Sequence, residues 1–217
     1  GGVTTGWGCG LVGFVGVWGA GGGQGGGGGS CRWSAQRGGL SGVRLPMPML
    51  NSINGGKNAD SGLDCQEFMI VPVGSATFHE ALRASVETFH ALKGILRDRR
   101  HSTSVGDEGG FAPRLSSSEE ACALIVEAIT STGRVPGRDV ALALDPAATT
   151  FATDRRYRLS RDGSERSSAE MNALYAALVD AYPIVSIEDG LAEDDWEGFA
   201  EQTALLGSRL QIVGDDI

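Results

Sequence analysis

Acidic residues at the ends of short apolar runs are the feature of this sequence with the clearest chemical meaning. Asp145, Glu188 and Asp215 each come at or just after the end of such a run. If the runs are parallel strands, their carboxyl ends meet at one edge of a sheet and the three side chains converge. Convergent carboxylates repel one another unless a cation lies among them, and hard divalent cations such as Mg²⁺ take oxygen ligands. The pattern therefore predicts a metal site; the alternative is that each acid caps a following helix or pairs with a basic neighbour.

A second acidic site is predicted in the segment Ser104–Pro113. There Asp107 and Glu108 stand side by side, with glycines on both sides of the pair. Adjacent negative charges repel unless a cation or a proton relieves them, and glycine permits unusual backbone angles. The segment is therefore suited to aim its acids at a ligand, although a plain solvated turn can have the same sequence.

Apolar periodicity predicts alternating strands and helices from Arg44 onward. Strands are expected at 45–50, 67–73, 140–144, 184–187 and 210–213, and helices at about 77–98 and after the capping residues Ser117, Ser167 and Asp194. The residues expected on the inward face of the first helix are Phe78, Leu82, Val86, Phe89 and Leu96. The succession of strand, acid and helix is typical of a parallel (β/α) barrel, whose active sites lie at the carboxyl ends of the strands.

The first 43 residues differ in composition from the rest. They contain more than half of the chain's 34 glycines. Such a segment has too few side chains to repay the entropy of ordering, so residues 1–43 are expected to be disordered and residues 44–217 to form the folded domain. The apolar stretch Leu11–Ala20 is short, is interrupted by glycines and has no basic residue before it. A signal peptide or membrane span is therefore not expected.

Charge and cysteine usage exclude further classes of protein. The net charge of −9 argues against a nucleic-acid partner, whose phosphates require a basic face. The four cysteines form no Cys-x-x-Cys pair, so neither a disulfide framework nor a zinc site is expected. We therefore expect a cytoplasmic protein with no nucleic-acid and no membrane partner.

From about residue 38 to residue 217 the sequence resembles the barrel domain of enolase. The similar motifs are Leu-Pro-Met-Pro-Met-Leu-Asn at 45–51, Asn-Gly-Gly at 54–56, Gln-Glu-Phe-Met at 66–69, Gly-Asp-Glu-Gly-Gly-Phe-Ala-Pro at 106–113, Ala-Leu-Asp at 143–145, Ser-Ile-Glu-Asp at 186–189, Glu-Asp-Asp-Trp-Glu at 193–197 and Val-Gly-Asp-Asp at 213–216. These motifs match enolase itself and argue against another member of its superfamily. The resemblance implies an α/β fold: a (β/α)8 TIM-like barrel of enolase type whose first two strands are antiparallel. The present chain would supply the first five strands of that barrel.

For function, the resemblance implies the reversible dehydration of 2-phosphoglycerate to phosphoenolpyruvate with Mg²⁺, by a homodimer or larger homo-oligomer. It assigns the Mg²⁺ to Asp145, Glu188 and Asp215. It also makes Glu108 the general acid that protonates the departing hydroxyl. Glu67 would assist near that hydroxyl and bind substrate, and Gln66 would contact substrate.

Two residues depart from the family pattern, and several family residues have no counterpart in the chain. Asn58 stands where the family usually has a histidine in its substrate-binding loop, and asparagine can donate a hydrogen bond but cannot carry charge. Pro146 follows Asp145 and has no backbone N–H to donate. The resemblance places the lysine base, a substrate-binding histidine and a second lysine beyond Ile217, so we expect these 217 residues alone to be inactive. The alternative function is a catalytically dead enolase-like fragment that acts, if at all, as a binding protein.

Overall fold

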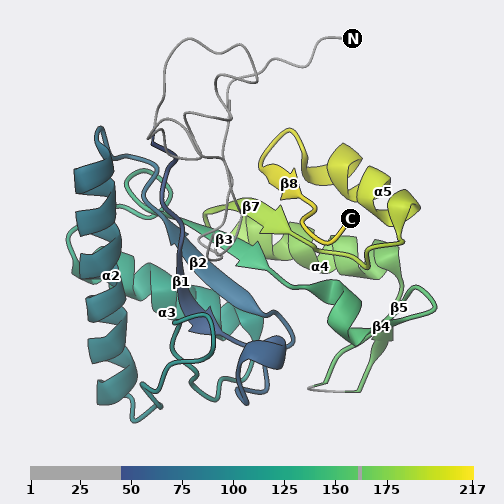
Figure 1. The fold of residues 1–217 in the computed structure, drawn as a ribbon, viewed down its shortest axis with the longest axis horizontal. Coiled ribbons are helices and arrows are strands. Elements are labelled where there is room, and N and C mark those ends of the chain that lie inside the picture. Colours follow the sequence, from purple (N-terminus) through teal and green to yellow (C-terminus); the bar gives the residue numbers. More distant parts are fainter. Residues whose placement is uncertain (1–44, 161–162) are drawn as a thin grey trace, which may run out of the picture.

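A five-stranded mixed sheet is the centre of the computed structural model, which describes residues 45–160 and 163–217 (Figure 1). The segment 1–43 that the sequence separates from the rest lies outside the described residues. The strands of the sheet are β1 (Leu50–Asn54), β2 (Glu67–Val71), β3 (Ala141–Asp145), β7 (Ile184–Glu188) and β8 (Gln211–Val213). They lie side by side in the order β1-β2-β3-β7-β8.

The strand directions agree with those implied for the start of an enolase-type barrel. β1 pairs antiparallel with β2, and β2 pairs antiparallel with β3. β3, β7 and β8 are then parallel to one another. Within the described residues β1 and β8 are the two edges of this sheet. The strands therefore form an open sheet of mixed strand directions and not a closed barrel.

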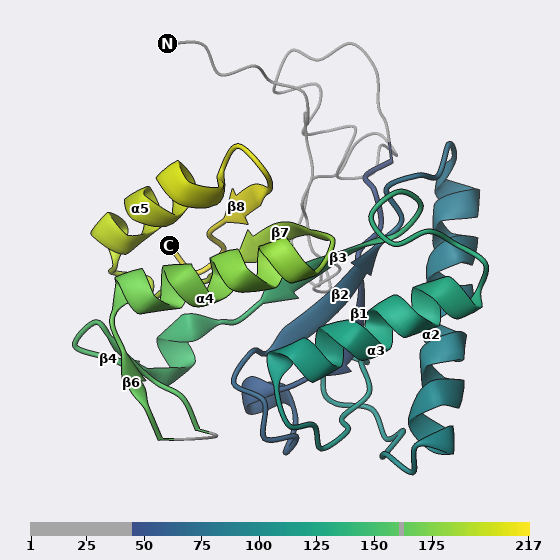
Figure 2. The same cartoon turned by 180° about the vertical axis from the view of Figure 1, so that it is seen from behind.

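Four α-helices accompany the sheet in the part of the chain that the structure describes. They are α2 (Phe78–Asp98), α3 (Ser118–Ser131), α4 (Ser168–Ala181) and α5 (Trp196–Leu206). Figure 2 shows α3 and α4 lying across one face of the sheet, where buried residues from strands and helices form the main apolar core. The predicted Ser167 capping box is confirmed, because the Ser167 hydroxyl accepts from the Glu170 backbone N–H while the Glu170 carboxylate accepts from the Ser167 N–H.

Short elements between β3 and α4 were not predicted from the sequence. They comprise the 3-10 turn η2 (Ala148–Phe151) and a small antiparallel sheet of β4 (Ala152–Thr153), β5 (Arg156–Arg158) and β6 (Glu165–Arg166). Tyr157, buried in β5, donates its hydroxyl proton to Asp195 Oδ2 at 2.7 Å, and Asp195 caps α5. This hydrogen bond fixes the small sheet to the start of α5. A further 3-10 turn, η1 (Gly56–Asn58), follows β1.

Three details of the predicted elements are wrong. β1 begins at Leu50, five residues after the predicted start, and Leu45 is 65% exposed. The capping residue of α5 is Asp195 and not Asp194. On α2, the predicted inward residues Leu82 and Val86 are exposed. The buried residues of α2 include Ala81, Ala84, Ser85 and Thr88. Leu96 of the predicted face is fully buried, and Phe78 and Phe89 are half-buried, so only the positions of Leu82 and Val86 were misplaced.

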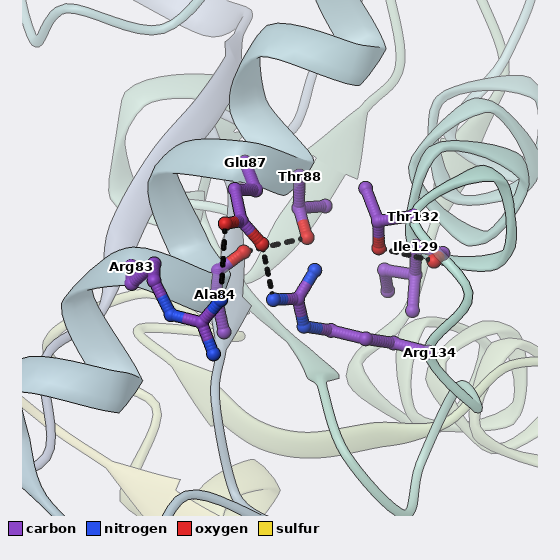
Figure 3. A network of polar contacts seen from close by, with 7 residues as sticks. All are labelled: Arg83, Ala84, Glu87, Thr88, Ile129, Thr132 and Arg134. Atoms are coloured by element: carbon purple, nitrogen blue, oxygen red, sulfur yellow. Dashed lines mark hydrogen bonds and ion pairs between the residues drawn. The ribbon is translucent and has the colours of Figure 1, made fainter.

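An ion-pair network joins α2 to the turn that follows α3. Figure 3 shows Glu87 of α2 between Arg83, one turn earlier on the same helix, and Arg134. Arg134 is the more buried of the two cations, with a side-chain exposure of 16%. The two guanidinium groups hold the pKa of Glu87 below its ordinary value, mainly through the hydrogen bond from Arg134. The network therefore fixes the position of α2 relative to the segment that leads into β3.

Leu142 tests the placement of the core. This side chain of β3 is fully buried, so Leu142→Ala should lower the free energy of unfolding by about 2–5 kcal/mol through lost apolar contact and the cavity left behind. Leu205→Ala, at a position on α5 that is 51% exposed, is the control and should change stability by less than about 0.5 kcal/mol. Urea denaturation followed by circular dichroism measures both. Equal losses in the two variants would contradict this packing.

Candidate active site

One edge of the sheet brings the predicted site residues together. Glu67 begins β2, and the antiparallel register places it opposite Asp145, the last residue of β3. On its other side Glu67 lies opposite Asn54, the last residue of β1. β7 is parallel to β3 and ends at Glu188, which is paired with Val213 at the end of β8. The acids thus share the edge at which β1, β3, β7 and β8 end.

Asp145 is strongly perturbed by this arrangement. Burial, followed by the charges of Glu188 and Glu67, raises the pKa of Asp145 from 3.8 to about 8. The backbone N–H of Ala147 donates to Asp145 Oδ1 at 2.9 Å and opposes the shift. Ala147 has a left-handed backbone, with φ of 47°, and this conformation turns the chain back toward the carboxylate. The opposing hydrogen bond does not offset the cost of ionising Asp145 next to other acids.

The pKa values of Glu67 and Glu188, the glutamates next to Asp145, are also raised. Burial and then the charges of Glu108 and Glu188 raise the pKa of Glu67 from 4.5 to about 7. Burial and then Asp189, Asp215 and Asp216 raise the pKa of Glu188 from 4.5 to about 7. Buried groups that repel one another in this way are a physical sign of a functional site.

The donor chemistry of this edge suits Mg²⁺, because Asp145, Glu188 and Asp215 offer carboxylate oxygens and the first two are destabilised as anions by acidic neighbours. Among the residues that the structure describes, however, no group of three or more His, Cys, Asp or Glu side chains is arranged closely enough to hold a metal ion. The structure thus places the acids at one edge without forming a coordination sphere. The assignment of Mg²⁺ to Asp145, Glu188 and Asp215 stays a prediction.

Asp189 is a residue of this edge to which the sequence gives no role. It is 4% exposed and has a left-handed backbone, with φ of 42°. Its Oδ1 accepts from the backbone N–H of Asp215 at 3.1 Å, and both of its oxygens lie within reach of the N–H of Asp216. Asp189 therefore fixes the segment after β8, which carries Asp215. Its position directly after Glu188 is the only signal in the sequence, and adjacency does not tell which acid faces a ligand and which faces the backbone.

The segment with Glu108 is attached to the end of β1. The N–H of Phe111 donates to Ser52 O at 2.9 Å, and the N–H of Asn54 donates to Phe111 O at 2.8 Å. At its other end the N–H of Asp107 donates to Asn58 O at 3.3 Å. Glu108 is exposed at the tip of this loop, and its charge is the largest contribution, after burial, to the raised pKa of Glu67. The predicted pair of glutamates is therefore brought together by these backbone contacts.

The remaining predicted residues lie next to the same edge. Gln66 immediately precedes β2, and its N–H donates to Asp145 O at 3.0 Å. Asn58 ends η1, and its side-chain Nδ2 is buried with no hydrogen-bond partner in the described part of the chain. Pro146 is buried directly after Asp145, and the N–H that bonds the Asp145 carboxylate comes from Ala147 instead. The proline is thus compatible with a backbone donor to Asp145, supplied one residue later.

Comparison with known proteins gives an independent view of this chain. The family model described as "Enolase, C-terminal TIM barrel domain" matches residues 42–217. Enolase 1 of Methylococcus capsulatus is 61% identical over 184 residues, which cover 84% of this chain and 44% of that protein. The chain therefore spans less than half the length of this curated relative. In the described part of the chain no helix is both long and apolar enough to cross a membrane.

The raised pKa values predict how stability depends on pH. Between the ordinary carboxyl pKa near 4 and the raised values of about 7 for Glu67 and Glu188 and about 8 for Asp145, the folded chain binds more protons than the unfolded chain. The free energy of unfolding should therefore fall as pH rises from 5 to 8. Mg²⁺ that binds the ionised acids of the folded state should raise the melting temperature more at pH 8 than at pH 5.

Scanning calorimetry at the two pH values, with and without Mg²⁺, measures this effect. Asp145→Asn removes the most perturbed carboxyl and should flatten the pH dependence. A melting temperature that rises from pH 5 to pH 8, or an Mg²⁺ effect that is equal at both, would contradict the arrangement of acids described above.

Proposed function

Because this chain belongs to the enolase family, we propose that the complete protein of which it forms the barrel portion is an enolase-type lyase. The reaction is the reversible dehydration of 2-phosphoglycerate to phosphoenolpyruvate. The observation that carries the proposal is the convergence of Glu67, Asp145 and Glu188 at one sheet edge, with Glu108 beside them. An edge of this kind suits a reaction in which a proton is moved and charge develops on a substrate carboxylate.

Glu108 and Glu67 together protonate the departing hydroxyl in this reaction. A carboxyl can protonate a leaving hydroxyl only if it still holds a proton near neutral pH. Burial and the charge of Glu108 raise the pKa of Glu67 to about 7, so Glu67 retains a proton over part of the neutral range. Glu108, exposed at the loop tip, delivers a proton to the hydroxyl, and Glu67 assists beside it and contacts the substrate.

Mg²⁺ would be held by Asp145, Glu188 and Asp215, where it would stabilise the negative charge that develops on the substrate carboxylate. Asp189 keeps the segment of Asp215 in place through its bonds to the backbone. Without the cation, Asp145 and Glu188 are costly to ionise. The chain's own role at this end of the site is thus to present oxygens that a cation can pair with.

Substrate contacts are assigned to side chains that border the same edge. Gln66 and Asn58 supply neutral amide donors for the phosphate or carboxylate oxygens, and neither adds charge to the site. The buried, unpaired Nδ2 of Asn58 supports this role. The protein acts in the cytoplasm as a homodimer or larger homo-oligomer, as the resemblance to enolase implies.

The general-acid role of Glu108 is tested in the complete protein. The wild type should convert 2-phosphoglycerate to phosphoenolpyruvate, whose absorbance reports the rate. Glu108→Gln keeps the shape of the side chain but has no proton to give, so the turnover number should fall by ~10²–10⁴-fold while Mg²⁺ binding is nearly unchanged. Glu201→Gln, an exposed acid on α5, is the control and should be as active as wild type. An inactive wild type would refute the lyase proposal, and a fully active Glu108→Gln would refute the acid role alone.

Asp215→Asn separates the metal ligands from the acid pair. Asparagine keeps one oxygen but loses the charge, so the Mg²⁺ concentration needed for half-maximal activity should rise. At saturating Mg²⁺ the turnover number should recover far more than it does in Glu108→Gln. The measurement is an Mg²⁺ titration of activity alongside calorimetric Mg²⁺ binding. Unchanged Mg²⁺ affinity in Asp215→Asn would remove this residue from the ligand set.

A further inference from the structure

Two buried asparagine side chains lie beneath the loop that carries Glu108. Asn54, the last residue of β1, is fully buried, and among the described residues neither its Nδ2 nor its Oδ1 has a hydrogen-bond partner. The Nδ2 and Oδ1 of Asn51, three residues earlier, are likewise buried without a partner in residues 45–160 and 163–217. Buried amide groups are normally satisfied, because an unmade hydrogen bond carries the full cost of desolvation. Two such amides side by side therefore require an explanation.

Both amides point at the glycines of the loop. A Cβ atom on Gly110 would lie 2.2 Å from Asn54 Oδ1 and 2.8 Å from Asn51 Oδ1. A Cβ atom on Gly106 would lie 2.9 Å from the Cβ and 3.0 Å from the Cγ of Asn54. The side chain of Asn54 thus occupies the space beneath both ends of the segment Gly106–Gly110, and only glycine leaves room for it. The polar groups of the two asparagines face a stretch of backbone.

The loop is anchored at both ends and exposed at its tip. Backbone bonds join Phe111 to Ser52 and Asn54 at one end, and Asp107 to Asn58 at the other. Asp107, Glu108 and Gly109, in contrast, are exposed. The backbone of Gly106 and Gly110 already lies against these amides, so only a small shift of the exposed tip between its two anchors is needed for hydrogen bonds to form. The same movement would change the position of Glu108 relative to Glu67.

We propose that Asn51 and Asn54 form a polar seat that binds the backbone of Gly106–Gly110 when substrate is present, and that this seat sets the position of Glu108. The two asparagines are positioning residues, since they act through the loop and not on the reacting atoms. This inference rests on the lyase function proposed above. It explains why two polar side chains that lack a hydrogen-bond partner among the described residues are kept at this buried site.

Asn54→Leu discriminates the seat from a role in the fold. Leucine has nearly the same size and lacks the polar groups, and replacing an unpaired buried amide by an apolar group is neutral or stabilising. The melting temperature of the substrate-free protein should therefore equal or exceed that of wild type. The matched control is Asn172→Leu on α4, where the amide does donate to Gly198 O at 3.2 Å. That variant should melt at a lower temperature and leave the Glu108 loop unaffected.

Hydrogen exchange in the complete protein supplies the direct readout. Substrate with Mg²⁺ should slow amide exchange across Gly106–Gly110 in wild type and in Asn172→Leu. In Asn54→Leu this protection should be weaker by roughly 2- to 10-fold, which is the effect of one lost hydrogen bond. The turnover number of Asn54→Leu should fall by roughly 10- to 100-fold because Glu108 is misplaced, while the Mg²⁺ affinity is kept.

Three results would overturn the seat. The first is an Asn54→Leu protein with wild-type loop protection and turnover. The second is a substrate-free Asn54→Leu protein that melts well below wild type. If leucine prevents folding, Asn54→Ala repeats the test without added bulk, and the third result is normal loop protection in Asn54→Ala. A wild type that is inactive refutes the lyase function itself, which separates that failure from failure of the seat in an active enzyme.

Discussion

Mutual repulsion among half-buried carboxylates is the constraint on which the rest of this structure depends. Asp145 and Glu188 end adjacent parallel strands, and Glu67 starts the antiparallel strand beside them. Each of the three has a raised pKa, and in each case burial and neighbouring acids are the causes. The fold thus keeps these acids together although ionising them side by side costs free energy. It holds the acids in place through the apolar core on the helix-covered side of the sheet, whose strand residues Phe68, Leu142, Leu144 and Ile187 are almost completely buried.

Backbone N–H groups divide these acids into two kinds. Asp189 accepts from the N–H groups of Asp215 and Asp216, which oppose the increase of its pKa. The carboxylate of Asp189 thus binds the backbone of the segment after β8 and holds that segment in place. The pKa values of Glu67 and Glu188 are raised by burial and by other acids, with no opposing hydrogen bond among the causes. Their charges are therefore available to a cation, a proton or a substrate. Asp145 lies between the two kinds, because the Ala147 N–H donates to its Oδ1 while burial and acidic neighbours still raise its pKa to about 8.

Much of this architecture could be predicted from the sequence, for physical reasons. Short apolar runs that end in an acid mark both the strand and the edge at which it stops, and serine capping motifs mark the starts of α3 and α4. The packed face of α2 was predicted only in part: Leu96 is buried as expected, but Leu82 and Val86 are exposed while the smaller Ala81 and Ala84 are buried. The role of Asp189 was missed as well, since it depends on a left-handed backbone and on bonds to a distant segment.

The asparagines beneath the Glu108 loop show that the hydrogen-bond partners of a side chain carry information that its sequence motif does not. In the sequence, Asn54 is part of an Asn-Gly-Gly motif, and asparagine before glycine is explained well enough by a turn. In the structure its side chain is fully buried, has no hydrogen-bond partner among the described residues and excludes any Cβ at Gly110. A turn does not require any of these three properties. The glycines of the acidic loop and Asn54 of β1 therefore depend on one another. Because Gly106 and Gly110 have no side chains, the amide of Asn54 can lie directly against the backbone of the loop. The position of the acid is in this way coupled to a strand end that carries no charge.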